Sequence, residues 1–317
     1  MTKTKIIIDC DPGQDDAVML MMAFARRDVF DIAAICTVAG NVGVKKTTRN
    51  ALIMCETTGT LDIPIYEGCA RPLARELFTA AEVHGEEGMN GVKIYEPDLK
   101  AQDESAVSYL IRTLSAARSG EYTLVITGPM TNIAAALIQN PDIKDGIAEI
   151  VLMGGALTLG GNVTPSAEFN IFVDPHAADI VYKSGIKTVS IGLDVTHSVL
   201  ASKARLAHIK SIGNKVAEAA ADILGPYSFF DSEKYGSDGG PLHDPCTIAY
   251  LLDRSLFKTK FCNIEVECNS ELTIGHTAVD FWHGMDPDER PANTHWAYEV
   301  DDDGVYALLF DCLERYS

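Results

Sequence analysis

The sequence predicts an α/β protein with one open, mainly parallel, doubly wound sheet of the Rossmann-like type. Short apolar runs typical of buried strands alternate with helical patterns along the chain, which is typical of a parallel sheet with helices on both faces. Polar residues gather directly after the predicted strands, at the carboxyl edge where such sheets bind ligands. No linker, repeat or low-complexity segment interrupts the pattern, so we expect residues 1–317 to form a single domain with its active site at that edge.

The first strand and the first helix are the clearest elements. Residues 6–8 are all isoleucine, as in a short buried strand. Pro12 and Gly13 end this strand, because proline cannot continue a central strand and glycine permits a sharp turn. The apolar run over 17–25 then predicts a buried helix that begins near Gln14.

The other elements follow from periodicity and from glycine and proline boundaries. Further strands are predicted at residues 31–37, 63–66, 122–127, 147–153 and 188–193. Further helices are predicted at residues 44–57, 106–117, 132–139, 175–183, 202–212, 216–224, 246–252 and 305–313. The remaining segments are a polar loop at 67–103, an aromatic-rich loop after residue 224, and a late antiparallel hairpin of 261–268 with 272–281.

Composition and charge restrict the class of protein. The 317 residues carry a net charge of −19, which opposes a phosphate-binding surface, so nucleic acid is not an expected partner. The apolar runs are too short to span a membrane and the amino terminus lacks a signal-peptide pattern, so we expect a cytoplasmic protein with no membrane partner. The eight cysteines form no C-x-x-C pair, which favours free thiols over a structural zinc site.

An acidic cluster at the end of the first strand is the main candidate for chemistry. Its members, Asp9, Asp11, Asp15 and Asp16, lie within eight positions. A single Asp at a strand end often only caps the next helix, whose amino terminus favours one or two carboxylates but does not need four. Carboxylates crowded this closely stay ionised only beside a cation, and a hard divalent ion with oxygen ligands fits best. The cluster therefore predicts a metal or catalytic site.

Five spaced motifs extend this prediction over nearly the whole chain. They are DPGQDDA at 11–17, VAGN at 38–41, TGPMTN at 127–132, EFN at 168–170 and HDP at 243–245. In this order they resemble the nucleoside hydrolase family, whose members include the inosine-uridine preferring type. The resemblance implies a calcium-dependent N-glycosyl hydrolase of purine and pyrimidine nucleoside salvage, which converts a ribonucleoside to ribose and free base. It also implies a homodimer or homotetramer.

The resemblance assigns the calcium ligands. Carboxylates of Asp11, Asp16 and Asp244 and the backbone carbonyl of Thr127 would hold the ion. The ribose 2′ and 3′ hydroxyls and a water would fill the remaining positions, which suits the six to eight oxygen ligands of calcium. Asp11 would also act as the catalytic base, because it would take a proton from the metal-bound water that attacks the anomeric carbon.

The resemblance also assigns the ribose contacts. Asp15 and Asn170 would hold the 2′ and 3′ hydroxyls, and Asn41 would lie close to the ribose and the attacking water. Asn162 and Glu168 would bind the 5′ hydroxyl. Carboxylate and amide oxygens near the ring would stabilise the positive charge of an oxocarbenium-like transition state. A site that binds both ring hydroxyls should prefer ribose to deoxyribose.

At the other end of the scissile bond, the departing base needs a proton or strong hydrogen bonds. His243 is the first candidate for this catalytic role, and His84 is a second candidate on the base side. His197 matches a strand end of the family but receives no chemical role. Four aromatic residues are candidates for stacking on the base: Phe169, Tyr227, Phe230 and Tyr235. The sequence does not decide between purine and pyrimidine.

Two other functions remain open from the sequence. One is a non-catalytic, calcium-dependent nucleoside-binding protein, which the intact set of Asp11, Asp16 and Asp244 disfavours. The other is a metal-dependent phosphotransferase with an Asp nucleophile at the first strand. That reaction would need a Lys or Arg for the phosphate, and none of the strand-end motifs carries one.

Overall fold

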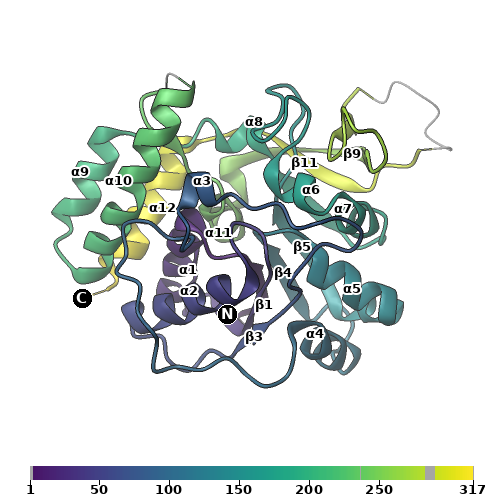
Figure 1. The fold of residues 1–317 in the computed structure, drawn as a ribbon, viewed down its shortest axis with the longest axis horizontal. Coiled ribbons are helices and arrows are strands. Elements are labelled where there is room, and N and C mark those ends of the chain that lie inside the picture. The colour runs from purple at the N-terminus through teal and green to yellow at the C-terminus, as the bar shows by residue number, and fades with distance from the viewer. Residues whose placement is uncertain (1–2, 236, 283–289, 317) are drawn as a thin grey trace.

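A nine-stranded sheet forms the centre of the fold (Figure 1). The computed structural model describes residues 3–235, 237–282 and 290–316, and for residues 227–235 it describes the backbone alone. The strands of the sheet are β1 (Thr4–Cys10), β2 (Phe30–Thr37), β3 (Ile65–Glu67), β4 (Tyr122–Ile126), β5 (Ile147–Met153), β6 (Thr188–Ile191), β9 (Phe257–Val266), β10 (Thr277–Asp280) and β11 (Thr294–Val300). Two short strands, β7 (Leu200–Ala201) and β8 (Gly240–Pro241), pair separately.

The strand order confirms the predicted doubly wound, mainly parallel sheet. Within the described residues the order is β10-β9-β11-β6-β5-β4-β1-β2-β3. All pairs from β11 to β3 are parallel, and β9 and β10 add an antiparallel edge, as the predicted late hairpin requires. Because the chain moves outward from β1 in both directions, the ends of β1, β2 and β4 lie next to one another.

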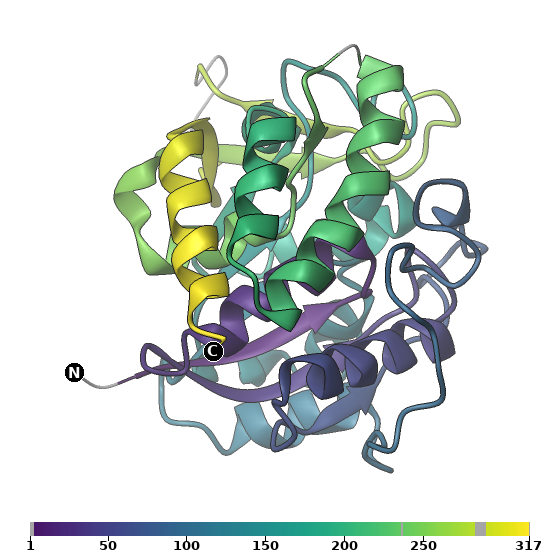
Figure 2. The same cartoon turned by 90° about the vertical axis from the view of Figure 1, so that its left-hand side faces the viewer.

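Helices cover both faces of the sheet. On one face lie α1 (Gln14–Ala25), α2 (Val44–Thr58), α9 (Lys203–Ser211), α10 (Lys215–Tyr235), α11 (Pro245–Leu252) and α12 (Asp302–Glu314). On the other lie α4 (Ala106–Ser115), α5 (Thr131–Gln139) and α7 (Pro175–Tyr182). Figure 2 shows α9, α10 and α12 packed together on the outside of the first layer. Three short helices, α3 (Ala81–His84), α6 (Phe169–Val173) and α8 (Leu193–Thr196), lie in connections near the carboxyl edge.

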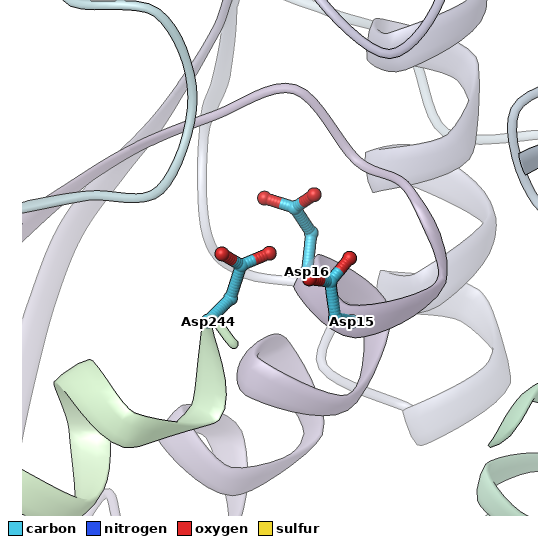
Figure 3. A group of neighbouring side chains, drawn as sticks. All are labelled: Asp15, Asp16 and Asp244. Atoms are coloured by element: carbon cyan, nitrogen blue, oxygen red, sulfur yellow. The ribbon is translucent and has the colours of Figure 1, made fainter. Parts of the chain in front are cut away.

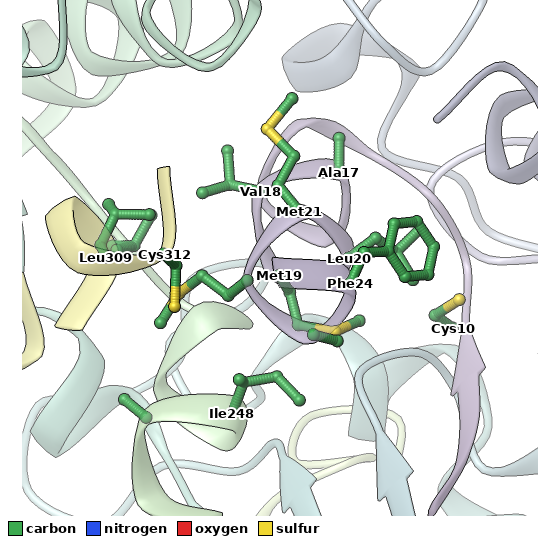
Figure 4. Close-up of a cluster of buried hydrophobic side chains, with 14 of the residues drawn as sticks. Cys10, Ala17, Val18, Met19, Leu20, Met21, Phe24, Ile248, Leu309 and Cys312 are labelled. Atoms are coloured by element: carbon green, nitrogen blue, oxygen red, sulfur yellow. The ribbon is translucent and has the colours of Figure 1, made fainter. Parts of the chain in front are cut away.

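Helix α1 forms the centre of the larger core, as its apolar sequence predicts. Every residue of this helix from Gln14 to Phe24 is buried. Its side chains pack in one hydrophobic cluster with Ile248 of α11 and with Leu309 and Cys312 of α12 (Figure 4). This packing fixes the start of α1, and with it the acidic turn that follows β1. Among the described helices, none is both long and apolar enough to cross a membrane.

Two predictions about elements need correction. The aromatic-rich loop predicted after residue 224 is helical, because α10 continues through Pro226 to Tyr235. Packing of residues such as Ile223 and Leu224 into the core supports this helix against the local cost of a proline. The sequence analysis also missed β11, in which polar residues interrupt the apolar ones, although it lies in the sheet between β9 and β6.

Candidate active site

The predicted site residues meet at the carboxyl edge of the sheet. Asp11 follows β1, Asn41 follows β2 and Thr127 follows β4. The connection after β5 returns to the same edge through α6, which carries Asn170. Parallel strands end at one edge, so residues more than 100 positions apart in the chain come together there.

Three carboxylates from two helix starts face one another (Figure 3). Asp15 and Asp16 lie in the first turn of α1, and Asp244 directly precedes α11. One oxygen of each carboxylate lies within 4.8 Å of the others, and all three residues are buried. Asp16 also accepts a hydrogen bond from the backbone N–H of Gly13 (2.9 Å), which caps α1. This group brings several oxygen donors to one point, as a hard divalent cation requires.

Asn41 holds Asp11 beside these three carboxylates. The backbone N–H of Asn41 donates to Oδ2 of Asp11 at 2.6 Å. Its side-chain amide donates to the backbone carbonyl of Asp11 at 3.0 Å and to Oδ2 of Asp16 at 3.3 Å. The second carboxylate oxygen of Asp11, Oδ1, is buried and makes no hydrogen bond with the described part of the chain. A buried polar atom of this kind indicates a ligand position.

Two glycines leave room for the Asp11 carboxylate. A Cβ atom at Gly40 would lie 2.0 Å from Oδ2 of Asp11, and one at Gly128 would lie 2.7 Å from Oδ1. Both distances are shorter than any ordinary contact of a Cβ atom. These positions therefore require glycine because of the close approach of the carboxylate.

Thr127 connects the carboxylates with the predicted ribose side. Its hydroxyl donates to Oδ1 of Asp16 at 2.7 Å, and its backbone carbonyl accepts from the side-chain amide of Asn170 at 2.9 Å. A carbonyl oxygen has two lone pairs, so one of them remains for a cation. The same amide of Asn170 donates to the carbonyl of Met153 at 3.2 Å. Asn170 is thus held against the ends of both β4 and β5.

Burial raises the pKa of every carboxylate in this group, and repulsion raises those of Asp11, Asp15 and Asp244 further. Burial is the largest cause for each of them, and it raises the pKa of Asp15 to about 7. Repulsion from Asp16 is the next cause for Asp11 and for Asp15. Within the described residues, no Lys or Arg forms an ion pair with any member of the group. A bound cation would offset this repulsion.

Glu168 and Asn162 support the segment that carries Asn170. Glu168 caps α6, because its carboxylate accepts from the backbone N–H groups of Asn170 (2.9 Å) and Ile171 (3.2 Å). Its Oε2 also accepts from the backbone N–H of Gly155 at 3.0 Å. Burial raises the pKa of Glu168 to about 7. Oδ1 of Asn162 accepts from the backbone N–H of Phe169 at 3.0 Å. The sequence analysis missed this capping role, because Glu is not among the residues that usually cap the amino terminus of a helix.

The histidines predicted on the base side are both buried near the acidic turn. A Cβ atom at Gly13 would lie 3.0 Å from Nδ1 of His84, so this ring reaches the turn after β1. Burial lowers the pKa of His84 to about 4. It also lowers the pKa of His243 well below its ordinary value, with repulsion from His197 as the next cause. The ring centroids of His197 and His243 lie 5.6 Å apart.

Thr196 is a neighbour of His243 that the sequence analysis missed. Its hydroxyl oxygen lies 2.7 Å from Nδ1 of His243, and both residues are buried. The only signal in the sequence is its place in Asp194-Val195-Thr196-His197, directly after a predicted strand.

The predicted stacking residues fall into two groups. Tyr227, Phe230 and Tyr235 belong to α10, and their side chains lie outside the described residues. Phe169 is buried in α6, with its ring centroid 6.4 Å from that of Phe78.

Together, the fold and the site define a class of protein. An open parallel sheet with buried carboxylates at its carboxyl edge is typical of an α/β enzyme that uses a divalent cation. The chain belongs to the nucleoside hydrolases, because the family model of the inosine-uridine preferring nucleoside hydrolase matches residues 6–307. It is therefore a metal-dependent hydrolase of ribonucleosides, as the sequence motifs predict.

Individual relatives agree with this assignment over their whole length. The chain is 43% identical over 312 residues to the pyrimidine-specific ribonucleoside hydrolase RihA of Photobacterium profundum, which covers 98% of this chain and 99% of the relative. The solved purine-preferring ribonucleoside hydrolase from Gardnerella vaginalis is 33% identical, with a TM-score of 0.90 and 99% of each chain covered. The plant nucleoside hydrolase PpNRh1 is also 33% identical, with a TM-score of 0.91 and the same coverage.

Proposed function

We propose that this ribonucleoside hydrolase depends on calcium and that Asp11 activates the water that attacks the sugar. The observation that carries the proposal is the buried group of Asp15, Asp16 and Asp244, with Asp11 beside it, whose Oδ1 has no hydrogen-bond partner among the described residues. Burying several ionised carboxylates costs free energy unless a cation binds among them and offsets their charge.

The residues present fit calcium. Asp11, Asp16, Asp244 and the backbone carbonyl of Thr127 are the proposed ligands, and all of them offer oxygen, which hard cations prefer. Calcium accepts six to eight oxygens with flexible geometry, so it leaves positions for substrate hydroxyls. Magnesium needs near-ideal octahedral geometry and gives up its waters reluctantly. An all-oxygen site that must also accept ribose therefore favours calcium.

Calcium at this point would supply the positive charge that orients the 2′ and 3′ hydroxyls and lowers the pKa of a water. Asp11 is the proposed base, and the hydrogen bond from the backbone N–H of Asn41 holds its carboxylate in place. Asp15 and Asn170 are the proposed partners of the ribose hydroxyls. Asn162 and Glu168 are the proposed partners of the 5′ hydroxyl, since Oε1 of Glu168 accepts from the backbone N–H of Asn170 and has a second lone pair for a further hydrogen bond.

The proposed reaction is a single displacement at the anomeric carbon. The water oxygen forms a bond to this carbon while the N-glycosidic bond breaks and its electron pair leaves with the base. The water proton passes to Asp11. The base leaves as an anion that a hydrogen bond from the ring N–H of His243 stabilises, with His84 as a second base-side contact, and it takes its proton from solvent water. The carboxylates and the amide of Asn41 stabilise the positive charge on the ring. The products are ribose and free base.

A reducing-sugar assay tests this proposal. Substrates are uridine, cytidine, inosine and adenosine, because the relatives above include a pyrimidine-specific and a purine-preferring enzyme. Each is assayed with its 2′-deoxy form, in calcium and after chelation. We expect ribose release that stops on chelation and returns with calcium. We also expect discrimination against deoxyribose of up to about 10⁴-fold, since polar groups are left unpaired when a hydroxyl is missing.

Other outcomes of the same assay would contradict the proposal. Full activity in the chelated, calcium-free sample would exclude the cation. Calcium-dependent binding of nucleosides without release of ribose would identify a non-catalytic binding protein. Equal turnover of uridine and 2′-deoxyuridine would contradict the roles of Asp15 and Asn170.

We also propose that the protein acts in nucleoside salvage in the cytoplasm, as a homodimer or homotetramer. The eight free cysteines support a reducing compartment. Light scattering of the purified protein measures the oligomeric state. A monomer at micromolar concentration would contradict the proposed homodimer or homotetramer.

A further inference from the structure

We propose that Thr196 is a positioning residue for His243. Its hydroxyl donates a hydrogen bond to Nδ1 and fixes the imidazole as the tautomer that carries its N–H on Nε2. That N–H donates a hydrogen bond to the departing base and keeps its proton, so the ring stays neutral. This inference rests on the proposed role of His243 and adds a residue that determines whether His243 can perform it.

The backbone around the pair holds both residues at fixed positions. Thr196 ends α8, and its backbone N–H donates to the carbonyl of Gly192 at 3.2 Å. Just beyond it, β7 pairs with β8, and the backbone N–H of Leu242 donates to the carbonyl of Val199 at 2.8 Å. The segment that carries Thr196 is thus joined directly to the segment that carries His243. The 2.7 Å contact between their side chains is therefore part of a rigid arrangement.

The hydrogen bond is also specific to these two groups. Within the described residues, the Thr196 hydroxyl makes no other hydrogen bond, and Nδ1 is the ring atom of His243 that forms one. Thr196 is completely buried and His243 is 8% exposed, so water does not compete for the contact. Nε2 of His243 makes no hydrogen bond within the described part of the chain, and we assign this nitrogen to the substrate.

The proposed role of His243 requires one direction of this hydrogen bond. A neutral imidazole carries one N–H and one bare nitrogen, and the bond made by one nitrogen decides the state of the other. If the hydroxyl donates to Nδ1, Nε2 carries the proton and can donate to the base. If the hydroxyl instead accepted from Nδ1–H, Nε2 would be bare and could not donate. A threonine hydroxyl can donate, whereas a carboxylate at this position could only accept.

Two substitutions separate positioning from packing. Thr196→Val keeps the shape and removes the hydroxyl, and Thr196→Ser keeps the hydroxyl. Kinetic constants are measured on uridine, whose base leaves poorly, and on p-nitrophenyl riboside, which needs no proton on its leaving group. We expect Thr196→Val to lose about 10²-fold in kcat on uridine, approaching the loss of His243→Ala, and less than about 3-fold on the nitrophenyl riboside. Thr196→Ser should stay within about 3-fold of the wild type on both.

Thr188→Val is the matched control. Thr188 is also buried, its hydroxyl donates to the carbonyl of Ile186 at 2.9 Å, and it lies at the opposite end of β6 from α8. Its replacement removes one buried hydroxyl away from the site and should change neither leaving-group dependence nor kcat. Equal losses of Thr196→Val on both substrates, or no loss on uridine, would overturn the inference. Equal losses of His243→Ala on both substrates would instead overturn the proposed role of His243.

The tautomer can also be measured without any Thr196 variant. Histidine labelled with ¹⁵N in the calcium-loaded wild-type enzyme gives ring nitrogen shifts that distinguish the two tautomers, and the spectrum of His243→Ala identifies the signals of His243. We expect the proton on Nε2. A proton on Nδ1 would overturn the inference even if Thr196→Val fails to fold.

Discussion

At the turn between β1 and α1, two adjacent aspartates have different surroundings. Asp16 accepts hydrogen bonds from the backbone N–H of Gly13 and from the hydroxyl of Thr127. Asp15 instead faces the carboxylate of Asp244, and burial raises its pKa to about 7. The hydrogen bonds orient Asp16, which suits a permanent metal ligand, whereas Asp15 is assigned to a substrate hydroxyl. Adjacent identical residues can therefore have separate proposed roles.

The proposed role of Asp11 as the catalytic base gives a prediction at the scale of a single residue. Asp11→Asn keeps the size of the side chain but cannot accept a proton at the same atom. We expect kcat to fall by about 10²–10⁴-fold, with a much smaller change in KM. Steady-state kinetics on uridine or inosine measure both constants, with the exposed Asp142→Asn as control. A raised KM with unchanged kcat would assign Asp11 to binding alone.

A second prediction concerns Gly40, where a side chain would collide with the carboxylate of Asp11. Gly40→Ala would place a Cβ atom 2.0 Å from Oδ2 of Asp11, whereas a Cβ atom at Gly43 meets nothing within 4 Å. The carboxylate of Asp11 must move in the first variant, and a displacement of about 1 Å in a catalytic group can cost about 10²-fold in rate. We expect that loss for Gly40→Ala and near wild-type kcat for Gly43→Ala. Equal activity of the two variants would show that the carboxylate can shift without consequence.

At the scale of elements, short helices position the proposed sugar and base contacts. Helix α6 carries Asn170 and begins at the buried cap Glu168. Helix α8 carries Thr196, and its Asp194 accepts from the backbone N–H groups of Leu157 and Thr158, each at 2.7 Å. Such short helices have little stability of their own, so tertiary hydrogen bonds must hold them. Side-chain caps therefore contribute to the geometry of the site as well as to stability.

The cap of α6 predicts a pH dependence of stability. Burial raises the pKa of Glu168 to about 7 in the folded state, above its ordinary value of 4.5. The folded chain thus binds this proton more tightly than the unfolded chain does. The protonated Glu168 therefore contributes fully to the free energy of unfolding below pH 4.5, and this contribution is lost as pH rises through 7. Glu168→Gln cannot ionise. Between pH 5 and 8 we expect the free energy of unfolding of the wild type to fall more than that of the variant, by on the order of 3 kcal/mol.

Urea unfolding in excess calcium measures this difference, and Glu121→Gln is its control. The hydrogen bond from Lys5 lowers the pKa of Glu121 to about 2. Because this folded-state value lies below the ordinary one, its contribution is lost only as pH falls through about 2. In Glu121→Gln, the free energy of unfolding should change between pH 5 and 8 by the same amount as in the wild type. If the free energy of unfolding of the wild type and that of Glu168→Gln change equally with pH, Glu168 does not titrate in this range.

At the scale of the whole molecule, the site lies where the core meets the edge of the sheet. The start of α1 carries two of the four carboxylates, while the rest of this helix is packed in the larger hydrophobic cluster. The carboxylates are therefore buried with the core, and their repulsion opposes folding when no cation is present. Binding of a cation should stabilise the whole chain.

Calcium should accordingly raise the melting temperature of the chelated protein. A ligand that binds only the folded state stabilises it by about 2.7 kcal/mol at a hundredfold excess over its Kd. Thermal unfolding with and without calcium measures the shift, and Asp16→Ala should remove most of it because a proposed ligand is lost. An identical melting temperature of the wild-type protein under both conditions would contradict a calcium site in the folded chain.

The sequence by itself determined the order of elements near the site and the residue types at the strand ends. Residues 6–8, Pro12 and Gly13 mark the end of β1, because periodicity and turn chemistry depend on neighbouring residues. The spacing of Asp11, Asp15 and Asp16 follows from the same local rules. The match of five motifs to one family adds Asp244 to the group, which no local rule could connect with β1.

Only the tertiary structure decided how distant segments meet. The contact of Thr196 with His243 joins residues 47 positions apart, and the close approach of Asp11 to Gly40 depends on the pairing of β1 with β2. The continuation of α10 through Pro226 and the insertion of β11 beside β6 likewise depend on packing. The physical reason is the same in each case. Packing energies are summed over contacts from several elements, and they outweigh the preferences of any short stretch of sequence.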